Sequence, residues 1–108
     1  MLEAAPVTML VGYHPKPGKE KELIALVAKH WPTLDRLGLV TKTKARIWRA
    51  TDKDSGRAYF LEMFQWKDGR ASDVAHQTPE VMAIWEPMGP ILENLTLTRI
   101  EPLDAAKP

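Results

Sequence analysis

The sequence predicts an α+β domain whose strands and helices follow the order βαββαβ. Four short runs of apolar and β-branched residues alternate with two segments of helical apolar spacing, and clusters of Gly and Pro separate several of them. The length of 108 residues favours one domain with its own core. We therefore expect a single ferredoxin-like domain over residues 1–108, with a core of about 7–102. It would have a four-stranded antiparallel sheet with two helices on one face.

The first strand is predicted at Val7 to Tyr13, a β-type run that ends in the Pro/Gly cluster of residues 14–18. The first helix follows from Lys19 to Arg36, and Pro32 is expected to kink or restart it. Gly38 suits the left-handed position that ends a helix. The apolar residues of this helix recur at helical spacing, at Leu23, Ile24, Val27, Trp31 and Leu34.

The second and third strands are predicted as a hairpin, Thr41 to Ala50 and Arg57 to Trp66, joined by the turn residues 51–56. Side chains alternate between the two faces of a strand. The sequence leaves open which face of the third strand packs on the helices. One face would carry Phe60, Glu62, Phe64 and Trp66, and the other Tyr59, Leu61, Met63 and Gln65.

The second helical region is predicted in two pieces, a short turn at Ala71 to His76 and a helix core at Pro79 to Trp85. Thr78 is expected to cap the second piece, because Pro79 suits the first position of a helix. The last strand is predicted at Leu95 to Ile100. Between this helix and the last strand, no regular helix is expected, because of Pro87, Gly89 and Pro90.

The third strand is largely apolar on both faces, although two helices cover only one face of such a sheet. A contiguous exposed apolar face usually marks a protein–protein interface. Pairing of two sheets about a two-fold axis would bury it. We therefore expect a homodimer formed through the open sheet face.

Composition and charge exclude several classes of function. The chain has no cysteine, which excludes disulfides and thiolate chemistry and favours a cytoplasmic location. Its net charge is +1, with 15 basic and 14 acidic residues, which argues against nucleic acid or a membrane surface as partner. The first residues do not form a signal peptide, and no apolar run reaches the roughly 20 residues of a membrane span. The three histidines lack ligand spacing, so we expect no metal site.

Two motifs carry a resemblance to a known family. Glu62-x-Phe64-x-Trp66 closes the third strand, and Ala75-His76-x-x-Pro79-x-Val81 opens the second helix. With the element order, they make the chain resemble the dimeric α+β barrel superfamily, in its antibiotic-biosynthesis-monooxygenase-like branch. That superfamily includes cofactor-free monooxygenases of polycyclic phenols and quinols, haem-degrading enzymes, small-molecule isomerases and proteins of unknown activity. The segments 37–40 and 84–89 resemble a subgroup of the last kind.

The resemblance also bears on cofactors. Haem-degrading members place an asparagine on the first strand and both a tryptophan and a histidine along the second helix. This chain has Gly12 and Tyr13 on the first strand, and Trp85 with Glu86 on the second helix. We therefore expect neither haem nor another cofactor.

His76 and Glu62 are the candidate catalytic residues. His76 would act as a general base or donate a hydrogen bond to a phenolate. The alternative is that it orients the helix entry through a backbone hydrogen bond. Glu62 lies among apolar residues and needs a partner, for which Arg46, Arg49 and His76 are candidates, in either an acid/base role or a structural ion pair.

Three functions of different class remain open from the sequence. The first is a cofactor-free, monooxygenase-like enzyme acting on a small aromatic or lipophilic molecule between helices and sheet. In it, His76 would approach Trp66 and edge a pocket closed by Trp85. The second is a non-catalytic dimer that binds such a molecule, and the third is a structural dimer with a filled interior. The substrate-binding candidates are aromatic: Trp66, Trp85, Phe64 and Tyr13.

Overall fold

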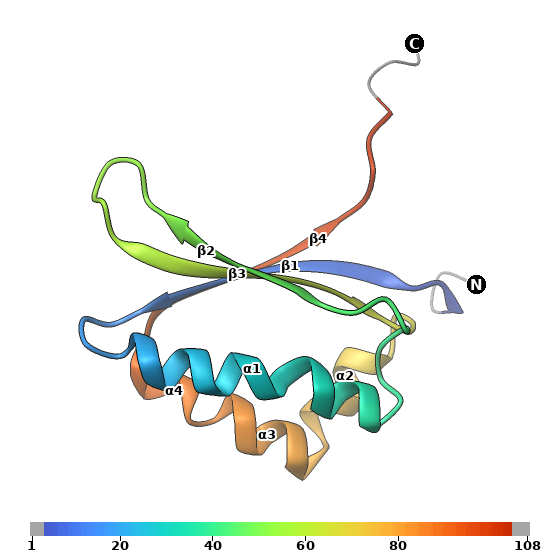
Figure 1. Ribbon diagram of the computed structural model, residues 1–108. Helices are drawn as coiled ribbons and strands as arrows, with labels where there is room; N and C mark the ends of the chain where they lie inside the picture. Colours follow the sequence, from blue (N-terminus) through green and yellow to red (C-terminus); the bar gives the residue numbers. More distant parts are fainter. Residues whose placement is uncertain (1–3, 105–108) are drawn as a thin grey trace.

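The computed structural model describes residues 4–104. Four antiparallel strands form one sheet in the order β2-β3-β1-β4, and the four helices lie on one side of it (Figure 1). The predicted fold class is confirmed. The strands are β1 (Val7–Pro15), β2 (Arg46–Thr51), β3 (Ala58–Trp66) and β4 (Leu92–Ile100). The helices are α1 (Glu20–Arg36), α2 (Ala71–His76), α3 (Pro79–Trp85) and α4 (Met88–Ile91).

The second helical region is divided into three short helices. Pro79 begins α3 as predicted, because its ring and missing N–H prevent α2 from continuing through it. Thr78 occupies the cap position, but the predicted cap bond is wrong. Its hydroxyl donates to the carbonyl of Val74 at 2.7 Å, so the side chain binds the end of α2 instead of an N–H of α3. Residues 88–91 also form a helical turn, which the sequence did not predict.

Three strand boundaries differ from the prediction by two residues or more. β1 does not end at Tyr13 but continues to Pro15, inside the predicted Pro/Gly cluster. β2 begins at Arg46 and not at Thr41; before it, Val40 forms an isolated bridge with Trp66, and the Thr41 side chain bonds that of Gln65. β4 begins earlier, at Leu92, which pairs with Pro15 of β1. α1 runs through Pro32 without a break to Arg36.

The structure decides which face of the sheet is covered. In β3, Phe60, Glu62, Phe64 and Trp66 are buried beneath the helices, and the residues between them are half-buried on the other face. β1 contributes Val11 and Tyr13 to the covered face. Residues of α1 complete the core from above the sheet, at Leu23, Val27, His30 and Leu34.

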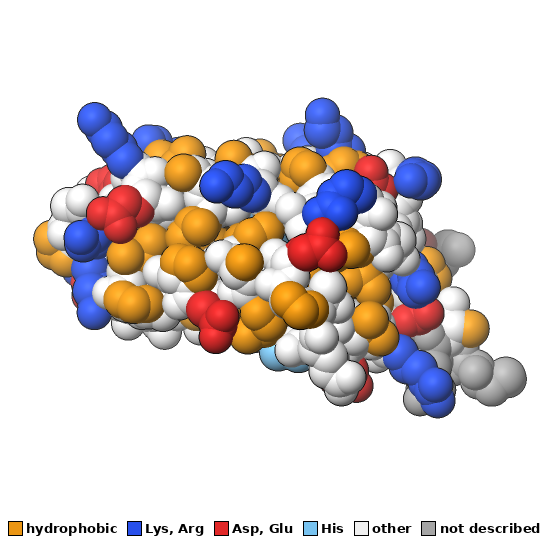
Figure 2. All heavy atoms as spheres, turned by 90° about the horizontal axis from the view of Figure 1, so that it is seen from below, with side chains coloured by type: hydrophobic (Ala, Val, Ile, Leu, Met, Phe, Trp, Pro, Cys, Tyr) orange, Lys and Arg blue, Asp and Glu red, His pale blue; other side chains and the backbone are white. Residues whose placement is uncertain are grey.

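The two outer surfaces differ. On the helix side, basic and acidic side chains are interspersed with apolar ones (Figure 2). The far face of the sheet is free of helices, and Trp48 is 38 % exposed there, beside the half-buried Leu61 opposite it in β3. The guanidinium carbon of Arg46 lies 5.0 Å from the ring centre of Trp48 on the same face. Among residues 4–104, each helix is too short or too polar to cross a membrane.

Candidate functional site

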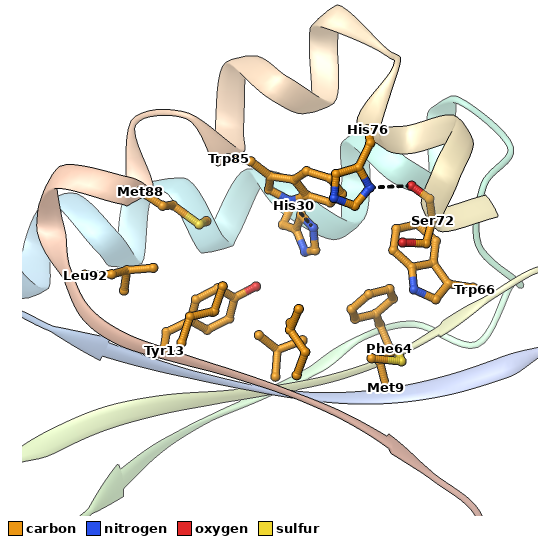
Figure 3. Close-up of a pocket in the computed structure, with 14 residues that line it drawn as sticks. Met9, Tyr13, His30, Phe64, Trp66, Ser72, His76, Trp85, Met88 and Leu92 are labelled. Atoms are coloured by element: carbon orange, nitrogen blue, oxygen red, sulfur yellow. Dashed lines mark hydrogen bonds between the residues drawn. The ribbon is translucent and has the colours of Figure 1, made fainter. Parts of the chain in front are cut away.

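A cavity of about 270 Å³ lies between the sheet and the helices (Figure 3). Its floor comes from β1 and β3, and its roof from α2, α3 and α4. Leu95 and Leu97 of β4 are 44 % and 66 % exposed and mark its open side. The aromatic side chains of the lining are those of Tyr13, Phe64, Trp66 and Trp85 together with the imidazoles of His30 and His76.

A carboxylate lies beside this cavity, fully buried at the centre of the sheet. Glu62 is 0 % exposed, and its neighbours across the strands are Val11 in β1 and Ile47 in β2. The hydroxyl of Tyr13 donates to Glu62 Oε1 at 2.6 Å. His30 Nδ1 lies 2.9 Å from Oε1 and 3.1 Å from Oε2. A carboxylate is tolerated in such a position only when donors of this kind compensate for lost water.

His30 connects the carboxylate to the cavity. The indole N–H of Trp85 donates to His30 Nε2 at 2.9 Å. An indole can only donate, so Nε2 carries the lone pair and the imidazole proton is assigned to Nδ1, which donates to Glu62. The result is a neutral imidazole of one defined tautomer. Tyr13, Glu62, His30 and Trp85 therefore form one continuous hydrogen-bonded chain.

This chain has the parts needed to remove a proton from a ligand. A carboxylate that accepts the Nδ1 proton orients the imidazole and stabilises the imidazolium that forms when Nε2 takes up a proton. The ring of Phe64 meets the imidazole edge-on, with centroids 5.4 Å apart, and excludes water from one side. His30 is 2 % exposed, yet it lines the cavity. A ligand in the cavity could therefore reach it.

Tyr13 serves this chain as a hydrogen-bond donor. Burial raises the pKa of its hydroxyl well above the ordinary value of about 10, and the Glu62 charge and hydrogen bond raise it further. The hydroxyl therefore stays protonated and supports the carboxylate.

Tyr13→Phe is expected to destabilise the protein less at pH 11 than at pH 8. The folded pKa is raised, so the stability that Tyr13 contributes is complete below pH 10 and declines above it, where the unfolded tyrosine ionises. One unit above a pKa of about 10, this linkage amounts to about 1.4 kcal/mol. Urea unfolding of both proteins at the two pH values measures the change. An equal cost of the substitution at both would contradict the assignment.

The candidate residues from the sequence lie in different parts of the site. Glu62 pairs with Tyr13 and His30, so the predicted partners Arg46, Arg49 and His76 are wrong. Both arginines are exposed: Arg46 lies over Trp48, and Arg49 pairs with Glu20 at 2.9 Å. Solvent stabilises their charges better than the core would.

His76 is exposed at the end of α2, where its Nδ1 lies 2.7 Å from the carbonyl oxygen of Ser72. Its ring stands 4.7 Å from that of Trp85, and it lines the cavity with Trp66 (Figure 3). This contact with Ser72 is a backbone hydrogen bond of the kind expected if His76 has a structural and not a catalytic role. Tyr13, Phe64, Trp66 and Trp85 all line the same cavity.

His30 is the residue that the sequence prediction overlooked. It belongs to the buried stripe of α1, in register with Leu23, Val27 and Leu34. A histidine on an apolar stripe needs a polar partner, and Glu62 is a second buried polar group in need of one. The sequence could therefore have indicated His30 as the partner of Glu62, because each of the two buried polar groups needs one. Within residues 4–104, no cluster of three or more His, Asp or Glu residues is arranged to hold a metal ion.

Comparison with known proteins gives similarity at the level of structure. No protein-family model matches the sequence, and no curated protein matches it either. A crystal structure of an antibiotic biosynthesis monooxygenase superposes with a TM-score of 0.69 at 14% identity, over 90% of this chain and 98% of that one. SnoaB, a cofactor-independent oxygenase from Streptomyces nogalater, gives 0.65 at 16%, over 94% and 99%.

A third structure, Rv0793 from Mycobacterium tuberculosis, gives a TM-score of 0.64 at 20% identity, over 94% of this chain and 99% of that one. Each of these superpositions covers nearly the whole of both chains. The agreement therefore extends over the sheet and the helices alike. The chain therefore has the α+β fold that is seen in these three structures, among them an antibiotic biosynthesis monooxygenase and SnoaB.

Proposed function

We propose that the protein is a cofactor-independent, monooxygenase-like enzyme that acts on a small aromatic molecule with an acidic hydroxyl. The observation that carries this proposal is the buried Glu62–His30 pair, whose imidazole lines an apolar cavity. Indole and phenyl side chains suit an aromatic ligand. The structural similarity to SnoaB, which is a cofactor-independent oxygenase, supports the class of reaction.

In the proposed reaction, His30 Nε2 removes the hydroxyl proton of the ligand and Glu62 stabilises the resulting imidazolium. The ligand anion then reduces dioxygen itself. Where an activated CH₂ becomes a carbonyl, the substrate supplies all four electrons. One oxygen atom enters the product and the other leaves as water with the two CH₂ hydrogens. The hydroxyl proton returns to the product from His30. No external reductant is needed, because all four electrons come from the substrate.

Oxygen uptake with a panel of phenols, quinols and anthrone-type compounds tests this function. Assays would contain a metal chelator, and product formed under ¹⁸O₂ would be analysed by mass spectrometry. We expect at least one compound to consume one O₂ per molecule and to incorporate one labelled atom. Binding without oxygen uptake would contradict the proposal and favour a non-catalytic binding protein. Absence of both would favour a structural dimer.

We also infer that two copies pair through the open sheet face. The helices leave this face uncovered, and Trp48, Leu61 and Met63 place apolar surface on it. Burial of such a surface favours association.

Sedimentation at low micromolar concentration is therefore expected to give about 24 kDa, twice the chain mass of 12.2 kDa. Leu61→Lys should shift the protein to monomer, because it places a charge in the centre of the interface. Ile24→Lys is the matched control, since Ile24 is 41 % exposed on the helix side and should leave the dimer intact. A wild-type monomer would contradict the inference.

A further inference from the structure

Trp85 forms a hydrogen bond with His30 Nε2, the nitrogen that would accept the ligand proton in the proposed reaction. Its indole N–H donates to His30 Nε2 at 2.9 Å, and its side chain is half-buried at the end of α3. Figure 3 shows the indole between His30 and His76, on the helix side of the cavity. While this hydrogen bond lasts, the lone pair of Nε2 is directed at Trp85. A ligand cannot use that lone pair at the same time.

The bond also determines what else Nε2 can bind. A second donor cannot take the place of the indole N–H while the indole is there, because the lone pair of Nε2 accepts one hydrogen bond. A ligand hydroxyl can therefore reach Nε2 only after Trp85 has moved away. Because Trp85 is half-exposed, water can satisfy its N–H once it has moved.

We propose that Trp85 is a latch on His30, which a ligand opens by donating a hydrogen bond of its own to Nε2. This inference rests on the proposed function, because it takes Nε2 as the atom that receives the ligand proton. A ligand that displaces the indole without offering a donor leaves a buried acceptor unpaired, which is costly. An acidic hydroxyl forms a stronger hydrogen bond to Nε2 than the indole N–H does, whereas an ether forms none. The latch therefore favours binding of hydroxyarenes over binding of their ethers.

His76 has a positioning role in this arrangement. Its Nδ1 is held by the carbonyl of Ser72 at 2.7 Å, and its ring lies against the indole with centroids 4.7 Å apart. The ring therefore supports the closed position of Trp85 from the solvent side. Trp85 is also followed by Glu86 and Pro87, where α3 ends, so its backbone is not held within a longer helix.

The latch can be tested by NMR on the indole N–H groups of the four tryptophans. The Trp85 resonance is identified by its loss in Trp85→Phe. The probes are 2-naphthol and its matched ether, 2-methoxynaphthalene. In the wild-type protein, 2-naphthol should move the Trp85 resonance toward the position of a water-exposed indole, whereas the ether should leave it in place. An unmoved Trp85 resonance at saturation with 2-naphthol would overturn the proposal.

Affinities of the Trp85→Phe variant give the second readout. The phenyl ring keeps much of the apolar surface but cannot bond Nε2, so 2-naphthol no longer competes with an indole. We expect it to bind about tenfold more tightly than to wild type, and the ether to change less than about threefold. Equal tightening of both would mean that the substitution only enlarges the cavity, and would overturn the latch. Failure of 2-naphthol to bind either protein at millimolar concentration would also overturn it.

Neither readout involves oxygen chemistry, so the latch and the proposed function fail separately. A Trp85 response in a protein without turnover retains the latch and removes the oxygenase. Turnover in a protein whose Trp85 resonance does not move retains the oxygenase and removes the latch. If Trp85→Phe does not fold, the Trp85 resonance is assigned in the wild-type protein by triple-resonance NMR instead, and its shift with 2-naphthol still decides the question.

Discussion

Replacement of His30 by glutamine is expected to lower the rate of oxygen uptake about 10²- to 10⁴-fold, the usual contribution of a general base. The amide can still donate to Glu62 and accept from Trp85, so the hydrogen-bonded chain has a substitute at its centre. It cannot take up a proton at neutral pH. The loss should therefore appear in kcat with whichever hydroxyarene the wild-type protein oxidises. Far-UV circular dichroism would verify that the variant is folded.

His76→Gln provides the comparison, because both histidines line the cavity and only one contacts Glu62. Its loss should remain below about tenfold, since His76 acts on Trp85 and not on the ligand proton. A larger loss for His76→Gln than for His30→Gln would contradict the assignment of the base. It would restore His76 to the catalytic role that the sequence motif indicates.

Glu62→Gln is expected to lower the free energy of unfolding by about 3 kcal/mol, at the upper end of the range for hydrogen bonds to a charged group. Tyr13 and His30 both donate to Glu62 Oε1, and His30 Nδ1 also lies 3.1 Å from Oε2. An amide oxygen in the place of Oε1 can accept both bonds, but the amide N–H₂ then takes the place of Oε2 beside the Nδ1 proton, and two donors cannot bond each other. If the amide nitrogen faces His30, the imidazole proton must move to Nε2, where it would meet the indole N–H of Trp85. At least one buried donor is thus left unpaired. Urea unfolding at a fixed protein concentration measures this loss.

An exposed glutamate serves as the control for this substitution. Glu93 pairs with Arg57 at 2.9 Å, and the two side chains are about half exposed. Glu93→Gln should cost much less than Glu62→Gln, because solvent screens an exposed pair. Equal losses for the two glutamates would show that the buried chain contributes no special stability. A double-mutant cycle of Glu62→Gln with Tyr13→Phe should in addition be non-additive by more than about 0.5 kcal/mol, because the two residues share a bond.

The sequence by itself determined the four strands, the helices α1, α2 and α3, and their order, because these depend on residues close together in the chain. The period-two pattern of residues 58–66 made a strand with two defined faces, and the stripe of Leu23, Val27 and Leu34 made an amphipathic helix. Pro79 set the start of α3 for a reason contained in its own ring. The aromatic residues that line the cavity were also identifiable, since Phe64 and Trp66 end β3, Trp85 ends α3, and Tyr13 lies near the end of β1.

Only the tertiary structure decided which buried polar groups meet. Glu62 lies 32 residues from His30 and 49 from Tyr13, and Trp85 lies 55 from His30. Periodicity states which residues share a face, but not which face of the sheet receives α1 or at what height along a strand. The packing of α1 across β3 placed His30 above Glu62, while His76 stayed at the surface end of α2. A buried carboxylate requires donors that point at it, and the arrangement of these elements selected the imidazole of His30.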